Sequence, residues 1–156
     1  MTSRILNVLL ADDDADDCTL FKEALQELTI QTRFRTEPDG VQLMKRLTNK
    51  RWVVPDVLFL DLNMPRLNGY ECLKLIKGND QLKHLPVVIF STAYDQHTVD
   101  RAYEHKANFY IRKPTEFRQL KKVIFQVLNL ISQEQTAQPS KKKFMLTKRS
   151  TQQTQV

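Results

Sequence analysis

The sequence lacks any long apolar run: no stretch of its 156 residues approaches the roughly 20 apolar residues that a membrane span requires. Its N-terminal residues lead directly into a strand-like segment and contain no apolar core of a secretory signal. Only two cysteines occur, Cys18 and Cys72, and their spacing fits neither a metal site nor a disulfide framework. Internal repeats are also absent. We therefore expect a cytoplasmic protein with reduced thiols and no membrane span.

Charge is present but unevenly distributed. Charged residues make up 27% of the chain and apolar residues 41%, which is typical of a globular protein, and the length suits one domain. From Glu134 onward the chain has a net charge of +4 out of a total of +6. The high isoelectric point therefore says little about the folded part. The five basic residues of this end are Lys141, Lys142, Lys143, Lys148 and Arg149.

The last part of the chain differs from the rest in amino-acid composition. We expect residues 1–133 to form one domain and residues 134–156 to be a basic, Gln- and Lys-rich, flexible tail, because this composition has little apolar surface to bury. The lysine run is typical of a solvated segment. A sharper alternative is a docking peptide anchored by the short apolar island Phe144-Met145-Leu146.

Apolar, β-rich runs alternate five times with segments of helical periodicity. Residues 117–131 carry the most regular helical stripe and residues 95–105 the weakest. Apolar strands without period two, alternating with helices, predict an α/β fold: a doubly wound, five-stranded parallel sheet with helices on both faces. We expect the strand order 2-1-3-4-5, one of the common orders of such sheets. The expected strands are Ile5–Ala11, Ile30–Arg35, Val57–Leu60, Val87–Ser91 and Phe109–Arg112.

Polar residues follow the strands at the edge where parallel strands end together. Asp12 and Asp13 follow the first strand, Asp61 follows the third, Ser91 ends the fourth and Lys113 follows the fifth. In a doubly wound sheet the first and third strands flank the reversal of strand order, where sites form. Three clustered carboxylates repel one another unless a cation lies among them.

The charges of these residues suit a magnesium site. Three carboxylates, one Mg²⁺ and one ammonium sum to zero, and carboxylate and backbone carbonyl oxygens are ligands that Mg²⁺ prefers. A carboxylate held beside the metal can act as a nucleophile toward phosphorus and form an acyl phosphate. Lys113 would stabilise the charge of the transferring group, and the Ser91 hydroxyl could bind a phosphoryl oxygen.

With these residues in order, the chain resembles a response-regulator receiver domain of two-component signalling, from Ile5 to about Ile131. The motifs that carry the resemblance are Asp12-Asp13, the segment from Asp61 to Pro65 with Gly69, Ser91-Thr92-Ala93, and Lys113-Pro114. Each motif is weak alone, but all of them occur in order across five strands. The strand order 2-1-3-4-5 is the flavodoxin-like topology, and the resemblance implies the same order.

The resemblance implies a role for each site residue. Asp61 would be the phosphoacceptor, and Mg²⁺ (or Mn²⁺) would be bound by Asp12, Asp13, Asp61 and the backbone carbonyl of Asn63. Ser91 and Lys113 would contact the phosphoryl group. Tyr110 takes the place of the family's switch aromatic, and the Lys113–Pro114 bond is expected to be cis.

As function, the resemblance implies a phosphoacceptor module of a two-component phosphorelay, in a stand-alone receiver rather than an enzyme. A histidine kinase or phosphotransfer protein would phosphorylate Asp61. Output would pass to a downstream protein through the face formed by the fourth helix, fifth strand and fifth helix. No nucleic-acid-binding domain is expected, and a homodimer through the same face is possible.

Two alternatives use the same residues. A phosphatase of the haloacid dehalogenase class also has a strand-end aspartate and Mg²⁺, but needs a second carboxylate two residues on, where this chain has Asn63. A degenerate receiver that serves as a binding scaffold is the other alternative. Retention of every metal and phosphate position argues against it.

Overall fold

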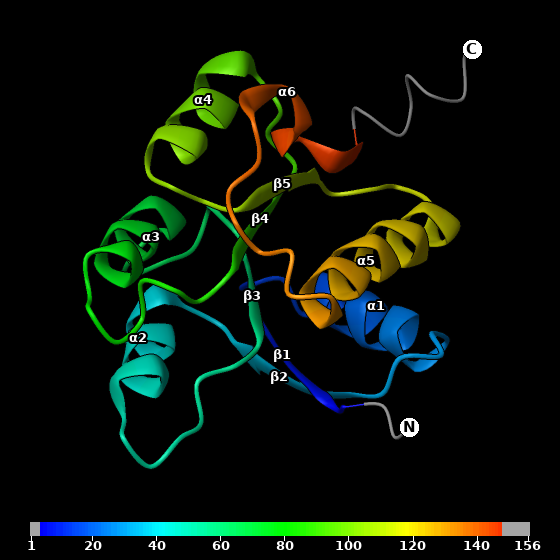
Figure 1. Cartoon of the computed structure of the whole chain (residues 1–156), viewed down its shortest axis with the longest axis horizontal. Coiled ribbons are helices and arrows are strands. Elements are labelled where there is room, and N and C mark those ends of the chain that lie inside the picture. The colour runs from blue at the N-terminus through cyan, green and yellow to red at the C-terminus, as the bar shows by residue number, and fades with distance from the viewer. Residues whose placement is uncertain (1–3, 148–156) are drawn as a thin grey trace.

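The computed structural model describes residues 4–147. Strands and helices alternate throughout (Figure 1). The strands are β1 Leu6–Ala11, β2 Thr32–Glu37, β3 Val57–Leu60, β4 Val87–Ser91 and β5 Phe109–Arg112. The helices are α1 Ala15–Gln26, α2 Gly40–Thr48, α3 Gly69–Lys77, α4 Gln96–Glu104, α5 Phe117–Ser132 and α6 Lys141–Phe144.

The five strands form one parallel sheet of order β2-β1-β3-β4-β5, which confirms the predicted α/β topology. Strands β3, β4 and β5 have the predicted bounds. Strand β2 begins two residues later than predicted, because Leu28 and Ile30 pack against the core before the strand starts. β2 is an edge strand with largely exposed residues, so its apolar signal is weak.

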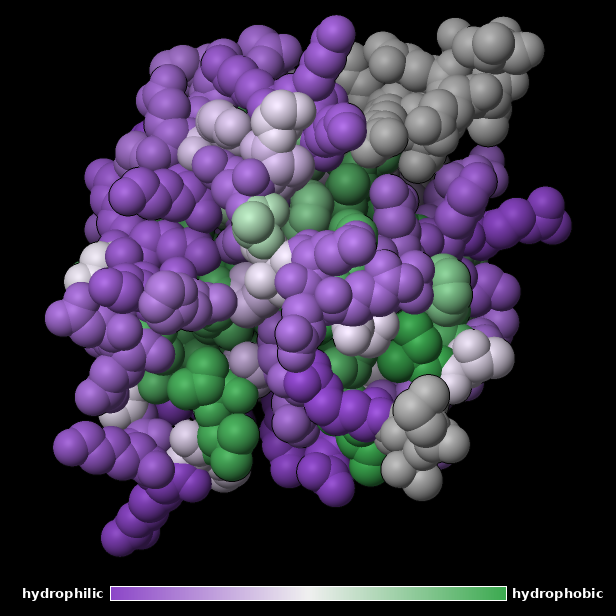
Figure 2. Space-filling model, in the orientation of Figure 1, coloured by the Kyte–Doolittle hydropathy of each residue, from purple (hydrophilic) through white to green (hydrophobic). Residues whose placement is uncertain are grey.

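Helices cover both faces of the sheet. Helices α1 and α5 lie on one face, and α2, α3 and α4 lie on the other (Figure 1). Each face has its own apolar core: Phe21, Phe59 and Ile124 belong to the first, and Leu58, Leu73 and Ile89 to the second. The central strands are buried on both faces, as their uninterrupted apolar runs predict. The face shown in Figure 2 is mostly hydrophilic, with apolar residues visible mainly in recesses.

The segment after α5 differs from the expectation of a flexible tail. Residues 136–147, which we call the C-terminal arm, pack along α4 and β5, and Phe144 and Leu146 are buried (Figure 1). The composition argument was wrong for this segment because a few well-placed apolar residues can be buried against a preformed domain. The division at residues 133 and 134 stays a prediction. Residues 148–156 of the expected tail, including Lys148 and Arg149, lie outside the described residues.

Two further expectations concern the backbone. The peptide bonds of residues 4–147 are all trans, so the expectation of a cis Lys113–Pro114 bond is wrong; trans is the lower-energy isomer of most X–Pro bonds. None of the helices in this part of the chain is long and apolar enough to cross a membrane.

Candidate functional site

The site forms where β1 and β3 end side by side. The two strands pair in parallel, with Ala11 opposite Leu60, so the next residue of each strand is an aspartate at the same edge. The amide of Asp61 donates to the carbonyl of Ala11 at 2.9 Å, which extends the ladder to the site. Asp12 and Asp61 therefore become neighbours through sheet register, although 49 positions separate them in sequence.

Three carboxylates converge at this edge. One oxygen from each of Asp12, Asp13 and Asp61 lies within 4.8 Å of the others. Asp12 and Asp61 are buried, whereas Asp13 is exposed, so the cluster is open on one side. Among residues 4–147, the buried Oδ2 of Asp12 accepts no hydrogen bond, and its contact there is an ion pair with Lys113. An all-oxygen donor set with a buried carboxylate oxygen that accepts no hydrogen bond fits a hard divalent cation such as Mg²⁺ or Mn²⁺.

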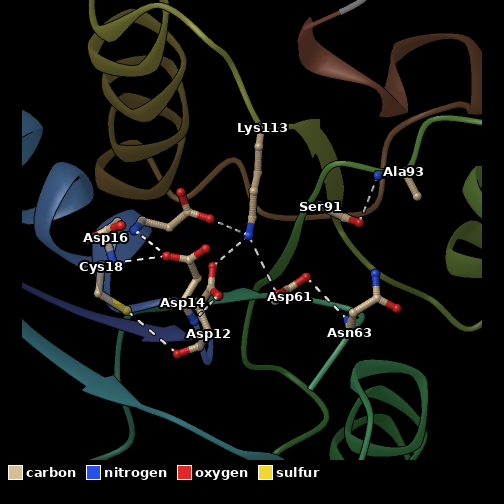
Figure 3. Close-up of polar contacts among 10 residues, drawn as sticks. Asp12, Asp14, Asp16, Cys18, Asp61, Asn63, Ser91, Ala93 and Lys113 are labelled. Atoms are coloured by element: carbon tan, nitrogen blue, oxygen red, sulfur yellow. Dashed lines mark hydrogen bonds and ion pairs between the residues drawn. The ribbon is translucent and has the colours of Figure 1, made fainter. Parts of the chain in front are cut away.

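Lys113 brings a positive charge into the cluster. Its side chain is 11% exposed, and its Nζ lies 2.8 Å from Oδ2 of Asp12 and 3.5 Å from Oδ2 of Asp61. Figure 3 shows the extended side chain pointing down from the end of β5 into the acidic cluster. Burial alone would lower the pKa of Lys113, but the close contacts with the carboxylates of Asp12, Asp17 and Asp61 outweigh burial and raise the pKa above its ordinary value. The ammonium is therefore charged at neutral pH.

Asp17 is a fourth carboxylate of the site, and the sequence analysis missed it. Its Oδ2 accepts a hydrogen bond from Lys113 Nζ at 2.8 Å. The aspartates after Asp13 also have an ordinary role at a helix start, since Asp14 caps α1 by accepting from the amides of Asp16 and Asp17. The sequence did contain a signal for a further site carboxylate: residues 12–17 include five aspartates, more than one helix start needs.

The environment of Asp61 disfavours a second negative charge. Burial, and then the charge of Asp12, raise the pKa of Asp61 to about 6. Its Oδ1 accepts the amide of Asn63 at 3.3 Å, which opposes the shift. Without a bound cation, the site therefore holds a proton more tightly than an ordinary aspartate. Asp61 carries a carboxylate at neutral pH, with an ammonium close by.

The loop between β3 and α3 fixes the backbone of Asp61. A Cβ on Gly69 would lie 2.3 Å from the Asp61 carbonyl oxygen and 2.7 Å from Leu62 Cα, so only glycine allows this approach. The Gly69 amide donates to the Leu62 carbonyl at 3.0 Å. Within the loop, Arg66 has a φ of 70°, a left-handed conformation that is uncommon for a non-glycine residue. The first turn of α3 is thus packed directly against the aspartate.

Ser91 ends β4, and Tyr110 lies within the neighbouring strand β5. The Ser91 hydroxyl accepts a hydrogen bond from the amide of Ala93 at 3.1 Å, and Figure 3 shows it turned toward that amide. Tyr110 is fully buried, and its hydroxyl donates to the Ala93 carbonyl at 2.6 Å. Burial raises the pKa of Tyr110 to about 12, so it is a neutral donor. Both side chains meet the segment after β4.

The structure thus brings together Asp12, Asp13, Asp61 and Lys113, and adds Asp17. Asn63 lies beside Asp61 through its amide, while the role of its carbonyl stays a prediction. Ser91 and Tyr110 lie one step away around the backbone of Ala93. The individual roles of these residues are taken up below as proposals.

Comparison with known proteins agrees with this geometry. Residues 8–125 match the family of response regulator receiver domains. The response regulator Rcp1 of Synechocystis is 32% identical over 121 residues, which cover 75% of this chain and 82% of that protein.

Solved structures of such proteins share the fold. The Mn²⁺-bound form of Rcp1 has a TM-score of 0.73 at 30% identity and covers 86% of this chain and 99% of its own. The phosphorylated cyanobacterial phytochrome response regulator RcpA has a TM-score of 0.74 at 30% identity, covering 81% of this chain and 94% of its own. The chain belongs to the response regulator receiver domain family and is a phosphoacceptor signalling module.

Proposed function

We propose that Asp61 is the residue that accepts the phosphoryl group. The observation that carries this proposal is the convergence of Asp12, Asp13 and Asp61 within 4.8 Å, with the ammonium of Lys113 3.5 Å from Asp61. An Asp61 carboxylate oxygen attacks the phosphorus of a phosphohistidine, the bond between phosphorus and the imidazole nitrogen breaks, and an acyl phosphate forms. The imidazole leaves with the bonding electron pair.

The divalent ion would be held by the carboxylates of Asp12, Asp13 and Asp61 and by the carbonyl of Asn63. When bound, it supplies positive charge that stabilises the transferring phosphoryl group. Lys113 contributes a further positive charge, and its ion pairs with Asp12 and Asp17 hold its ammonium at the site. The Ser91 hydroxyl would leave the Ala93 amide to bind a phosphoryl oxygen.

Signal output in this proposal depends on Tyr110. The phosphorylated state would favour Ser91 at the phosphoryl group and Tyr110 turned inward, where its hydroxyl bonds to Ala93. A downstream protein would then recognise the surface of α4, β5 and α5, and a homodimer through this surface is a further possibility. The module itself would turn over only its own acyl phosphate, and we expect it to work in the cytoplasm.

The phosphoryl donor in this proposal is a histidine kinase or a phosphotransfer protein. Several similar structures, at 29–31% identity, are named as response regulators of phytochromes or bacteriophytochromes. A kinase of that kind is therefore the first donor to test.

Mass spectrometry after incubation with acetyl phosphate and Mg²⁺ tests the proposal. We expect a single phosphoryl adduct that requires the metal and is lost in Asp61→Asn. Asp80→Asn is the matched control, because the side chain of Asp80 is 95% exposed and pairs with Lys83 in the segment between α3 and β4. An adduct that persists in Asp61→Asn would refute the assignment, and repeated turnover of a phosphoester would favour a phosphatase instead.

A further inference from the structure

The C-terminal arm, residues 136–147, occupies the surface of α4 and β5. Figure 1 shows it running from the end of α5 across to α4 and then along β5. This is the surface that the proposed function assigns to output. The C-terminal arm is therefore in contact with the proposed output surface of its own chain.

Polar contacts anchor the first half of the arm. Nε2 of Gln138 donates to the carbonyls of Tyr103 and Ala107 at 2.9 and 2.8 Å, which satisfies backbone oxygens at the end of α4. The hydroxyl of Tyr103 donates in return to the carbonyl of Pro139 at 2.9 Å. Lys141 pairs with Asp100 of α4 at 3.2 Å. Both the backbone and the side chains of the arm therefore take part in holding it on α4.

Apolar contacts and β pairing anchor the second half. Phe144 is fully buried, with its ring centroid 5.0 Å from that of Tyr103 and 6.1 Å from that of Tyr110. Met145 forms a parallel bridge with Tyr110, and the amide of Arg112 donates to the Thr147 hydroxyl at 3.1 Å. The arm thereby covers β5, which would otherwise be an open edge of the sheet.

The arm also contacts Tyr110, the proposed switch residue. Tyr110 and Phe144 are both fully buried and their rings are in edge contact, so an outward turn of the tyrosine would disturb the seat of Phe144. Phe144 and Tyr110 belong to the same apolar core. A second contact exists at the arm's end: Thr147 lines a cavity of about 370 Å³ together with Thr92 and Lys113. The arm therefore meets both the switch residue and the surroundings of the site.

We propose that the arm is the resident ligand of the α4–β5 surface, and that its docking is coupled to the inward position of Tyr110 and thereby to phosphorylation. This inference rests on the proposed function of Asp61. Because coupling between two sites is reciprocal, phosphorylation stabilises the docked arm, and the docked arm stabilises the phosphorylated state. The phosphorylated protein then presents the docked arm to its partner, and the bare α4–β5 surface is exposed only when the arm leaves.

Trypsin cleavage in the full chain tests the coupling, since Lys141, Lys142 and Lys143 lie within the arm. Cleavage of a segment that opens transiently follows the population of its open state. With Mg²⁺ and beryllofluoride, which mimics a phosphoryl group, we expect cleavage at these lysines to slow several-fold. Asp61→Asn abolishes this protection, and the fragment masses identify the cleaved bonds.

Two variants separate docking from coupling. Phe144→Ala should accelerate cleavage in the arm by about tenfold, since it removes a fully buried ring. The same change at Phe125, which is 42% exposed on α5, is the control and should leave the rate unchanged. Tyr110→Phe keeps the ring but loses the bond to Ala93, and should weaken the protection by beryllofluoride.

The outcomes distinguish the two proposals. If acetyl phosphate forms an adduct at Asp61 but beryllofluoride leaves arm cleavage unchanged, the coupling is refuted and the phosphoacceptor role stands. If no adduct forms at Asp61, the proposed function fails and the coupling falls with it. Equal acceleration by Phe144→Ala and Phe125→Ala would mean a general loss of stability, and would refute Phe144 as the anchor.

Discussion

At the scale of single residues, the site is a balance of four carboxylates against one ammonium. Lys113 lies equally close to Asp12 and Asp17, at 2.8 Å from each. Asp12 belongs to the three-carboxylate cluster of the proposed metal site, whereas Asp17 lies outside that cluster. Asp17 would therefore remain an ion-pair partner of Lys113 with a metal bound. This second partner would keep the lysine side chain ordered at the site.

Asp17→Asn should accordingly weaken Mg²⁺ binding. Lys113 would then depend more on Asp12, and the site would lose one nearby negative charge, so both effects act in the same direction. We expect a loss of about 1 kcal/mol, or roughly fivefold in affinity, by isothermal titration calorimetry. Asp16→Asn is the matched control, because Asp16 is exposed in the same helical turn and makes no contact with Lys113 in the described part of the chain. An equal loss in both variants would contradict a specific role of Asp17.

A second prediction at this scale concerns Ala93. We propose that its small side chain, two residues beyond Ser91, would leave open a path for the water that hydrolyses an acyl phosphate. Ala93→Tyr should obstruct that water and slow dephosphorylation by about tenfold, which corresponds to about 1.4 kcal/mol in the barrier. The decay of ³²P-labelled protein measures the rate, with Ala93→Ser as the control. An unchanged rate in the tyrosine variant would rule out the hypothesis.

At the scale of elements, the sheet brings the carboxylates together and the loops hold them in place. The register of β1 with β3 makes Asp12 and Asp61 neighbours, and the first turn of α3 packs on the Asp61 backbone. Helix α3 begins with a capping box between Asn68 and Glu71, which fixes where that turn starts. Asp61, the proposed phosphoacceptor, is therefore held by backbone packing more than by contacts of its own side chain.

Gly69→Ala tests this arrangement. The new Cβ would meet backbone atoms, at 2.3 Å from the Asp61 oxygen, and no rotamer change can relieve that contact. We expect a loss of about 1–3 kcal/mol in the free energy of unfolding, measured with urea, together with weaker Mg²⁺ binding. Gly78→Ala is the control, since its Cβ would only approach the Lys74 carbonyl at 3.1 Å. Stability equal to the wild type in Gly69→Ala would contradict the packing argument.

At the scale of the whole molecule, repulsion among the carboxylates of the site lowers the free energy of unfolding, and a bound cation would offset this loss. The pKa of Asp61 is raised from 3.8 to about 6, so the folded state binds its proton more tightly than the unfolded chain does. The resulting stabilisation is fully present below pH 3.8 and is lost as pH rises through about 6. At neutral pH the metal-free protein therefore carries the repulsion of adjacent carboxylates, and Mg²⁺ stabilises the fold by binding to them.

Thermal unfolding with and without metal measures this effect. Without Mg²⁺, the Tm of the wild type should fall relative to that of Asp61→Asn as pH rises from 4 to 7, because the asparagine does not titrate. Saturating Mg²⁺ at pH 7 should raise the Tm of the wild type much more than that of Asp61→Asn. A constant Tm difference across this pH range would contradict the raised pKa of Asp61.

Local patterns in the sequence determined the alternation of strands and helices, the parallel sheet and the cluster of Asp12, Asp13, Asp61 and Lys113 at one edge. They could do so because burial on both faces leaves an apolar run in each strand, and parallel strands bring their ends together.

Only the tertiary structure decided three features. Asp17 and Lys113, 96 positions apart, meet through packing. Gly69 lies against the Asp61 backbone. The arm covers β5, and its polar composition concealed that Phe144 and Leu146 bury against an existing core. Contacts between elements depend on shape, and periodicity along the chain does not encode shape.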